Sequence, residues 1–191
     1  MKGLRGTYDL TIPLMGEFQM ENAATAVAAV ESLNERGAKV TTESIATGLR
    51  EVRWPGRVQV LKRRPWVIAD SAHNAYSFKK LVQTIKGYFR FKRAILILGM
   101  SSDKDVAGIV AEAAALTGEV IVTRSRNPRA LDTAVMIREF SGHGITPQVA
   151  GDAPSALRLA MAKAAPGDLI CAAGSVFLAA EVMEEMGVKE F

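Results

Sequence analysis

The chain is organised around residues 66–74, Trp-Val-Ile-Ala-Asp-Ser-Ala-His-Asn. Its opening apolar run shows no alternation with polar residues, which is typical of a strand buried on both faces of a parallel sheet. In such sheets ligands bind beyond the carboxyl ends of the strands, where Asp70 and His73 would project. A carboxylate accepts hydrogen bonds from sugar hydroxyls, and an imidazole donates to phosphate. The alternative is that Asp70 and Asn74 only cap the following helix.

From residue 57 onward, apolar runs alternate with amphipathic segments. The apolar runs predict strands over residues 57–62, 66–69, 94–98, 120–122, 146–150 and 169–173. The amphipathic segments predict helices over residues 77–89, 105–117, 132–141 and 153–164, and a last helix that ends near residue 186. This alternation predicts an α/β fold, with a mostly parallel, Rossmann-like sheet and helices on both of its faces.

The first 52 residues predict too few elements to close a core of their own. They comprise an extended segment over Thr7–Leu14, a helix over residues 20–33 and a shorter helix over residues 42–50. The turn Trp54-Pro-Gly-Arg57 follows, in which proline fixes φ and glycine accepts a positive φ. We therefore expect residues 1–52 to be the end of one incomplete domain and residues 53–191 to form a second domain.

Composition favours a folded, cytoplasmic protein. The 191 residues are 49% hydrophobic and 23% charged, which suffices for a core. The single cysteine, Cys171, lies in an apolar run and predicts a buried residue in a reducing compartment. The sequence has no apolar segment of membrane-spanning length and no signal-peptide core, so we expect no membrane partner. The net charge is +4, but no basic tract is interleaved with aromatic residues, so we expect no nucleic-acid partner.

Four polar loops follow strands and would gather at one edge of the sheet, over residues 70–73, 99–103, 123–129 and 174–175. Such a gathering indicates a binding crevice. The loop at residues 99–105, Gly-Met-Ser-Ser-Asp-Lys-Asp, suits an anion at a helix N-terminus, unless its aspartates only cap the helix. Arg129 can grip a carboxylate through two parallel hydrogen bonds, and Ser175 follows a glycine in a second anion nest.

Two further residues are weak candidates when taken alone. Asn22 lies near a helix start, where its carboxamide can contact a purine edge, although asparagine there is more often a cap. Arg57 follows the rigid Pro-Gly turn, although a surface arginine beside Trp54 is the simpler interpretation. The sequence contains no GxxxxGK[ST] loop, no Cys/His cluster with metal-ligand spacing and no GxSxG elbow. We therefore expect no metal ligands in this chain.

Six short motifs are more specific in their order than any one of them alone. They are Glu21-Asn-Ala-Ala24, Trp54-Pro-Gly-Arg57, Asp70-Ser-Ala-His-Asn74, Asp103-Lys-Asp105, Pro128-Arg-Ala130 and Gly174-Ser-Val-Phe177. Together they resemble the folylpolyglutamate synthase/dihydrofolate synthase family, which belongs to the Mur-ligase superfamily of ATP-dependent amide-forming ligases. The resemblance covers nearly the whole chain. It implies that residues 1–52 are the end of the central ATPase domain and residues 53–191 are the C-terminal ligase domain.

The activity that the resemblance implies is the ATP-driven addition of L-glutamate to folate or dihydropteroate through an acyl phosphate. The cofactors would be ATP and Mg²⁺, the metal being held mainly by the central domain that this chain lacks. By their match to the family's motifs, Asn22, Arg57 and Asp70 would contact the nucleotide. His73 would lie near the phosphate and the acyl-transfer centre, and it is our catalytic candidate.

In the family the C-terminal domain closes over the central one and helps to place the incoming glutamate. We take Ser175, Arg129 and Asn74 as candidates for contacting glutamate here. The sequence departs from the family at two positions, because Ala75 stands where proline is usual and Phe18 stands where histidine is usual. Neither is an identified nucleotide contact, but Phe18 puts the polar role of its loop in doubt.

The P-loop and the magnesium-holding residues of the family have no counterpart in this chain. We therefore expect it to be part of a longer ligase, or else a degenerate domain that only binds, and to be inactive alone. Three alternatives remain open from the sequence. One is a peptidoglycan-precursor ligase that acts on a UDP-sugar peptide. Another is a non-catalytic α/β module that binds a nucleotide or metabolite or serves in assembly. The third is a nucleotide-binding response domain.

Overall fold

The computed structural model describes residues 1–3 and 6–188. It divides the chain into two compact units, the first over Met1–Trp54 and the second from Pro55 onward. Each unit has a separate core. No helix in the described part of the chain is both long and apolar enough to cross a membrane.

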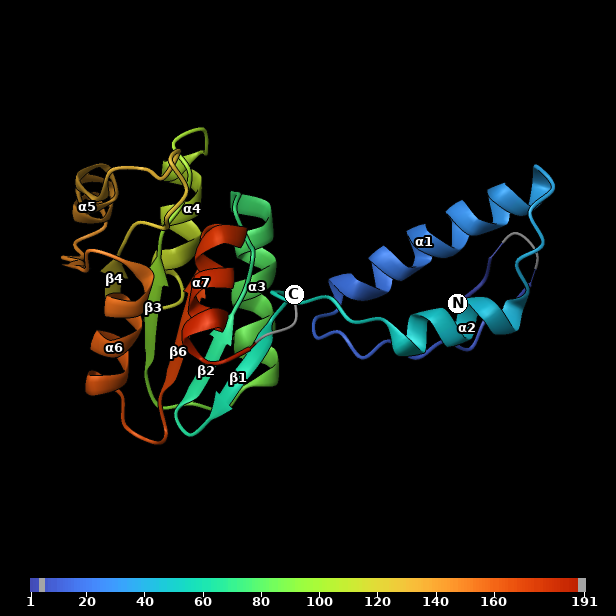
Figure 1. The fold of residues 1–191 in the computed structure, drawn as a ribbon, viewed down its shortest axis with the longest axis horizontal. Coiled ribbons are helices and arrows are strands. Elements are labelled where there is room, and N and C mark those ends of the chain that lie inside the picture. Colours follow the sequence, from blue (N-terminus) through green and yellow to red (C-terminus); the bar gives the residue numbers. More distant parts are fainter. Residues whose placement is uncertain (4–5, 189–191) are drawn as a thin grey trace. The chain divides into compact units, whose positions relative to one another are not determined.

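The first unit contains two helices, α1 (Phe18–Glu35) and α2 (Thr42–Glu51) (Figure 1). Its small core packs Tyr8 of the leading segment against Val27 of α1 and Ile45 of α2. The predicted extended segment Thr7–Leu14 is not a strand. Only an isolated bridge between Lys2 and Thr7 forms there, because the described part of this unit offers the segment no strand partner.

The second unit is built on a six-stranded sheet in the order β1-β2-β6-β3-β4-β5 (Figure 1). The strands are β1 (Gln59–Arg63), β2 (Trp66–Ala69), β3 (Ala94–Leu98), β4 (Val120–Val122), β5 (Gln148–Val149) and β6 (Leu169–Ala173). Only the β1–β2 pair is antiparallel, and the other pairs are parallel. The predicted α/β class with a mostly parallel sheet is confirmed.

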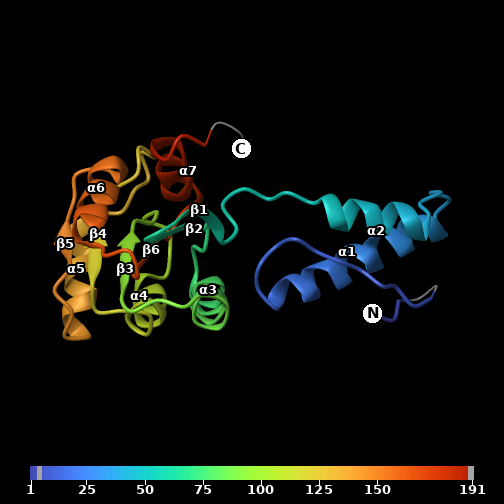
Figure 2. The ribbon, with the colours of Figure 1, turned by 90° about the horizontal axis from the view of Figure 1, so that it is seen from below.

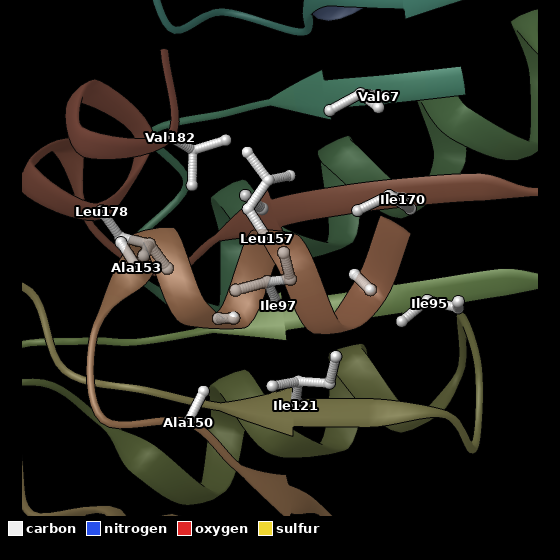
Figure 3. Packing of buried hydrophobic residues seen from close by; sticks show 13 residues of the cluster. Val67, Ile95, Ile97, Ile121, Ala150, Ala153, Leu157, Ile170, Leu178 and Val182 are labelled. Atoms are coloured by element: carbon white, nitrogen blue, oxygen red, sulfur yellow. The ribbon is translucent and has the colours of Figure 1, made fainter. Parts of the chain in front are cut away.

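Helices cover both faces of this sheet, as predicted. Figure 2 shows one set of helices on one face of the sheet and a second set on the other. The first set is α3 (Ala75–Tyr88), α4 (Val106–Ala114) and α5 (Thr133–Gly142), and the second is α6 (Ala153–Lys163) and α7 (Val176–Glu185). Between the sheet and α6 and α7 lies a dry core in which Leu157, Leu178 and Val182 pack on Ile97 and Ile170 (Figure 3). Burying side chains of this size stabilises the fold by about 1.5–3 kcal/mol each.

The parallel strands end at one edge, where their loops meet backbone to backbone. The Asp70 N–H donates to Ala172 O (2.9 Å), and the Gly174 N–H donates to Ala72 O (2.9 Å). Two glycines make this approach possible. A Cβ on Gly174 (φ +114°) would lie 2.6 Å from Gly99 O, and a Cβ on Gly99 would lie 2.8 Å from Thr123 O. The four polar loops are therefore neighbours at the carboxyl edge.

Candidate functional site

Asp70 follows β2 at this edge, with only 3% of its surface exposed. Its Oδ1 accepts a hydrogen bond from the Ala72 N–H (2.7 Å), and its Oδ2 accepts one from the Val58 N–H (2.8 Å). Asp70 is therefore not the helix cap that the sequence allowed. It joins its own loop to the turn that precedes β1.

The ionisation of Asp70 is set by burial and by these contacts. Burial raises the pKa of the Asp70 carboxyl above its ordinary value, because desolvation disfavours the charged form. The two backbone hydrogen bonds and the charges of Arg57 and His73 lower this pKa, but they do not cancel the effect of burial. A further cation or donor brought beside Asp70 would favour its charged form.

The turn that Asp70 holds is strained and carries Arg57. Val58 has a φ of 45°, in the left-handed region that β-branched residues rarely adopt. Besides the bond from Val58 to Asp70, the Ser71 N–H donates to Gly56 O (2.8 Å) and fixes the turn a second time. Arg57 is half-buried, and its guanidinium has no hydrogen bond or ion pair with the described residues. Strain that the surroundings hold in place is common at binding sites.

His73 is exposed and stands between Asp70 and α3. Its Nδ1 lies 2.9 Å from the Ser71 carbonyl oxygen. Since a carbonyl only accepts hydrogen bonds, Nδ1 carries the proton in this arrangement. Nε2 has no hydrogen-bond partner in the described part of the chain, so it is open to a contact with a ligand.

Asn74 is the N-cap of α3. Its Oδ1 accepts the Ser77 N–H (2.8 Å), and Ser77 Oγ accepts the Asn74 N–H (3.2 Å), which together make a capping box. The capping alternative is therefore right for Asn74. Its side-chain amide nitrogen forms no bond within the described residues, so it remains free to donate.

Ser175 begins α7 in the same way. Its Oγ accepts the Leu178 N–H (3.0 Å), and the residue is 5% exposed. The hydroxyl proton is not used by this bond, so it is available as a donor. The first backbone N–H groups of α7 form the positive end of its dipole at this point.

The loops at residues 99–105 and 123–131 are tied to each other. The Ser102 N–H donates to Arg129 O (2.9 Å), and the Leu131 N–H donates to Met100 O (2.8 Å). The Arg129 side chain is exposed and forms no hydrogen bond with the described residues. The pKa of the Asp103 carboxyl is lowered mainly by the hydrogen bond from the Lys104 ammonium, and the charge of Arg129 lowers it further by a smaller amount. Of the two aspartates in the first loop, Asp105 caps α4 by accepting the Gly108 N–H (3.0 Å).

Asn22 belongs to the first unit and is exposed on α1. Its Nδ2 donates to Gln19 Oε1 (2.9 Å), which leaves its Oδ1 available as an acceptor. Asn22 does not cap α1, because the N-cap position of that helix is Glu17. Its predicted contact with a nucleotide stays a prediction.

The single cysteine is placed in the core and not among the polar groups of this edge. Cys171 is fully buried in β6, and burial raises the pKa of its thiol, so it is an unreactive core residue. For metals, no group of three or more His, Cys, Asp and Glu side chains within residues 1–3 and 6–188 is placed to hold an ion.

Sequence reasoning missed the residues that hold the loops in place. It did not single out Val58, whose strain appears only in the fold, or Glu181, which anchors Arg126. A signal for Glu181 was present, because it is the one charged residue in the apolar run Val176–Met183. A lone carboxylate in such a run needs a specific partner.

This arrangement defines the class of open α/β domains that bind ligands at the carboxyl edge of a parallel sheet. The sequence profile of the family described as Mur ligase, glutamate ligase domain matches residues 56–176, and the chain belongs to this family.

Relatives of known name agree with this membership. The dihydrofolate synthase/folylpolyglutamate synthase of Mycobacterium tuberculosis is 36% identical over 139 residues, which are 71% of this chain and 28% of that protein. The structure of Mycobacterium tuberculosis folylpolyglutamate synthase complexed with ADP has a TM-score of 0.88 and 30% identity, over 100% of this chain and 45% of that one.

A third relative has further ligands in its structure. It is a bifunctional folylpolyglutamate synthase/dihydrofolate synthase with Mn, AMPPNP and L-glutamate bound, with a TM-score of 0.82 and 28% identity, over 96% of this chain and 43% of that one. The chain therefore spans less than half the length of each of these three relatives.

Proposed function

We propose that the chain is the C-terminal part of an ATP-dependent ligase that adds L-glutamate to folate or dihydropteroate through an acyl phosphate. The observation that carries the proposal is the carboxyl edge of a glutamate ligase domain, where several polar side chains have no hydrogen-bond partner among the described residues. The backbones of their loops are held by hydrogen bonds, whereas the side chains of Arg57 and Arg129 and the Nε2 of His73 form no hydrogen bond or ion pair with the described residues. Groups prepared in this way favour anionic ligands such as phosphates and carboxylates.

The nucleotide contacts that we propose are those of Arg57, Asp70 and Asn22. A guanidinium without a partner can pair with a phosphate. Each Asp70 oxygen accepts one backbone N–H, and each keeps a second lone pair that can accept a ribose hydroxyl. The carbonyl oxygen of the Asn22 side chain is not used by its bond to Gln19, so it can accept a hydrogen bond from the base.

We propose that glutamate is held by Ser175, Arg129 and Asn74. Arg129 offers two parallel donors to one carboxylate, and the Ser175 hydroxyl and the Asn74 amide offer donors to the other. His73 acts at the amine. The Nδ1–H of His73 donates to Ser71 O, which leaves Nε2 as the acceptor nitrogen. Nε2 can then accept the proton that the attacking amine loses as the new amide bond forms and phosphate leaves.

The remaining parts of the ligase would supply the rest of the chemistry. We propose that residues 1–52 belong to the central ATPase domain and residues 53–191 to the C-terminal domain, and the division near Trp54 supports this. Mg²⁺ would be held by ligands from the rest of the ligase, which would act in the cytoplasm. The metal's role would be to neutralise charge on the transferred phosphate.

The test is amide formation by the full-length protein from ATP, glutamate and a panel of pterins. We expect ADP release to need both glutamate and either dihydropteroate or a reduced folate. The 191-residue chain by itself should hydrolyse no ATP above background, because it lacks the loop that cradles the β- and γ-phosphates. Turnover with a UDP-sugar peptide in place of the pterin would show that the protein is a peptidoglycan-precursor ligase. Nucleotide binding without glutamate-dependent turnover would favour a binding module.

A further inference from the structure

Glu181 is a buried carboxylate that the proposed chemistry does not use. It lies in α7 and is 6% exposed, in a stretch of otherwise apolar residues. Its Oε1 accepts a hydrogen bond from the Arg126 backbone N–H at 2.7 Å. Because an unpaired buried carboxylate is costly, this contact is required by the packing of α7.

The Arg126 side chain strengthens the contact from outside. Its Nε lies 3.6 Å from Glu181 Oε1, and its Nη2 pairs with Glu184 Oε2. The side chain of Arg126 is 71% exposed, so these ion pairs are screened by solvent and contribute little. The bond from the backbone N–H to the buried carboxylate is the firm part of the contact.

That bond anchors the middle of the loop that carries Arg129. The loop begins where the Thr123 N–H donates to Leu98 O (2.9 Å), and it ends where Arg129 O accepts the Ser102 N–H. Between these points, over residues 124–128, the described structure has no other hydrogen bond that ties the loop's backbone to another element. Without Glu181 the loop's backbone would be hydrogen-bonded to other elements only at its two ends, among the described residues, and the exposed Arg126–Glu184 ion pair would be left between them.

We propose that Glu181 is a positioning residue for glutamate binding, because it fixes the Arg129 loop to the helix that Ser175 begins. One helix thus sets the geometry between the two residues, with Ser175 as its N-cap and Glu181 in its second turn. The inference rests on the proposed function, in which Ser175 and Arg129 contact glutamate. Rigid positioning lowers the ordering cost of binding, so its loss acts on the affinity for glutamate.

The test compares Glu181→Ala, Glu181→Gln and Glu184→Ala in the full-length ligase. Glu181→Ala leaves the Arg126 N–H unpaired and should raise the KM for glutamate about tenfold, with the KM for ATP changed by less than about twofold. Glu181→Gln keeps an acceptor oxygen and should restore most of the affinity. Glu184→Ala is the matched control, because among the described residues the Glu184 carboxylate pairs only with the side chain of the same arginine. It should leave both KM values unchanged.

A purely structural role predicts a different result, in which both KM values stay unchanged and only the melting temperature falls. That result would overturn the proposal, as would Glu181→Gln behaving like Glu181→Ala. If Glu181→Ala does not fold, amide exchange in the 191-residue chain decides the question through Glu181→Gln. The Arg126 amide should stay protected in that variant, and full exposure would count against the anchor.

Arg129→Ala separates this inference from the proposed function. If Arg129→Ala leaves the KM for glutamate unchanged, the glutamate assignment of the loop is wrong, whatever Glu181 does. If Arg129→Ala raises this KM and Glu181→Ala does not, the assignment stands and the positioning role of Glu181 is overturned.

Discussion

Two aspartates lie at opposite ends of the same sheet and are equally hidden, yet their surroundings differ. Asp70 follows β2 at the carboxyl edge and Asp168 precedes β6 at the amino edge, and each has 3% of its surface exposed. Within the described residues, the Asp70 carboxylate accepts hydrogen bonds only from backbone N–H groups. In contrast, Asp168 Oδ2 accepts two donors from Arg93, Nε at 3.2 Å and Nη2 at 2.8 Å, besides the Ala165 N–H at 2.9 Å.

The difference distinguishes charged groups that are paired within the fold from groups that are open to a ligand. At the amino edge the Arg93 guanidinium is paired on several sides, because it also donates to Glu119 Oε1 (2.9 Å) and to Lys163 O (2.7 Å). At the carboxyl edge Arg57 and Arg129 form no such bonds with the described residues, and His73 uses only one of its ring nitrogens. Charges that are already paired hold the fold together, and charges that are held but unpaired are available to a ligand.

The largest expected effect tests the carboxyl edge at His73. In the full-length ligase with saturating ATP and glutamate, His73→Ala should lower kcat roughly a hundredfold or more, because a positioned acid–base group typically contributes that much. His143→Ala is the control, since His143 is exposed at the end of α5 and outside this edge. A kcat within about a factor of two of the wild type for His73→Ala would argue against a catalytic role.

The next effect compares the arginines of the two edges. Arg57→Ala and Asp70→Ala should weaken ATP use about tenfold to a hundredfold, because a lost charged hydrogen bond costs roughly 1.5–3 kcal/mol. Asn22→Ala should act in the same direction but more mildly. Arg93→Ala should leave the KM for ATP unchanged. Steady-state kinetics with ATP and glutamate varied separately would measure this, and a rise confined to the KM for glutamate would refute the nucleotide assignment.

Periodicity alone was enough to predict the elements of the second unit. The apolar run at residues 94–98 became β3 with its predicted limits, because a strand buried on both faces has no solvent-facing residue to blur its ends. Other limits differ from the prediction: β5 covers Gln148–Val149 of the predicted residues 146–150, and α3 begins at Ala75 and not at residue 77. The strand predicted from residue 57 begins at Gln59, since Val58 adopts a positive φ that cannot continue a strand. Helix α4 ends at Ala114, three residues before its predicted end.

The candidate site was predicted as a set of loops, but not as a set of contacts. Parallel topology brings the strand ends together, so the presence of Asp70, His73 and Ser175 at one edge followed from the pattern. The bond from Val58 to Asp70 spans twelve residues and depends on a turn conformation that no periodicity encodes. The Arg126–Glu181 anchor spans 55 residues and depends on how α7 packs. Such long-range contacts follow from the complete fold.

A smaller effect tests the amino edge. Asp168→Ala removes the acceptor for the Ala165 N–H and for Arg93, and should lower the free energy of unfolding by about 1–3 kcal/mol. Urea unfolding of the 191-residue chain would measure the loss. In the full-length ligase the same variant should keep the wild-type KM for ATP. A KM change as large as that of Arg57→Ala would show that the two edges are not separate in function.

The smallest effect is the opposite dependence of the two aspartates on pH. The Ala165 N–H, followed by Arg93, holds the pKa of Asp168 below its ordinary value of 3.8, whereas burial raises the pKa of Asp70 above it. For Asp168 the folded state binds its proton more weakly than the unfolded state. Its contribution to stability is therefore present above pH 3.8 and is lost as the pH falls through its folded pKa.

For Asp70 the sign is reversed, because the folded state binds the proton more tightly. Its contribution is fully present below pH 3.8 and is lost as the pH rises through its folded pKa. Titration of the aspartate carboxyl carbons by NMR should thus find Asp70 titrating above 3.8 and Asp168 below it, with Asp168→Asn assigning the second signal. If both signals titrated below 3.8, the donors around Asp70 would outweigh its burial. The carboxyl edge would then be as fully paired as the amino edge, and the contrast between the two ends of the sheet would be lost.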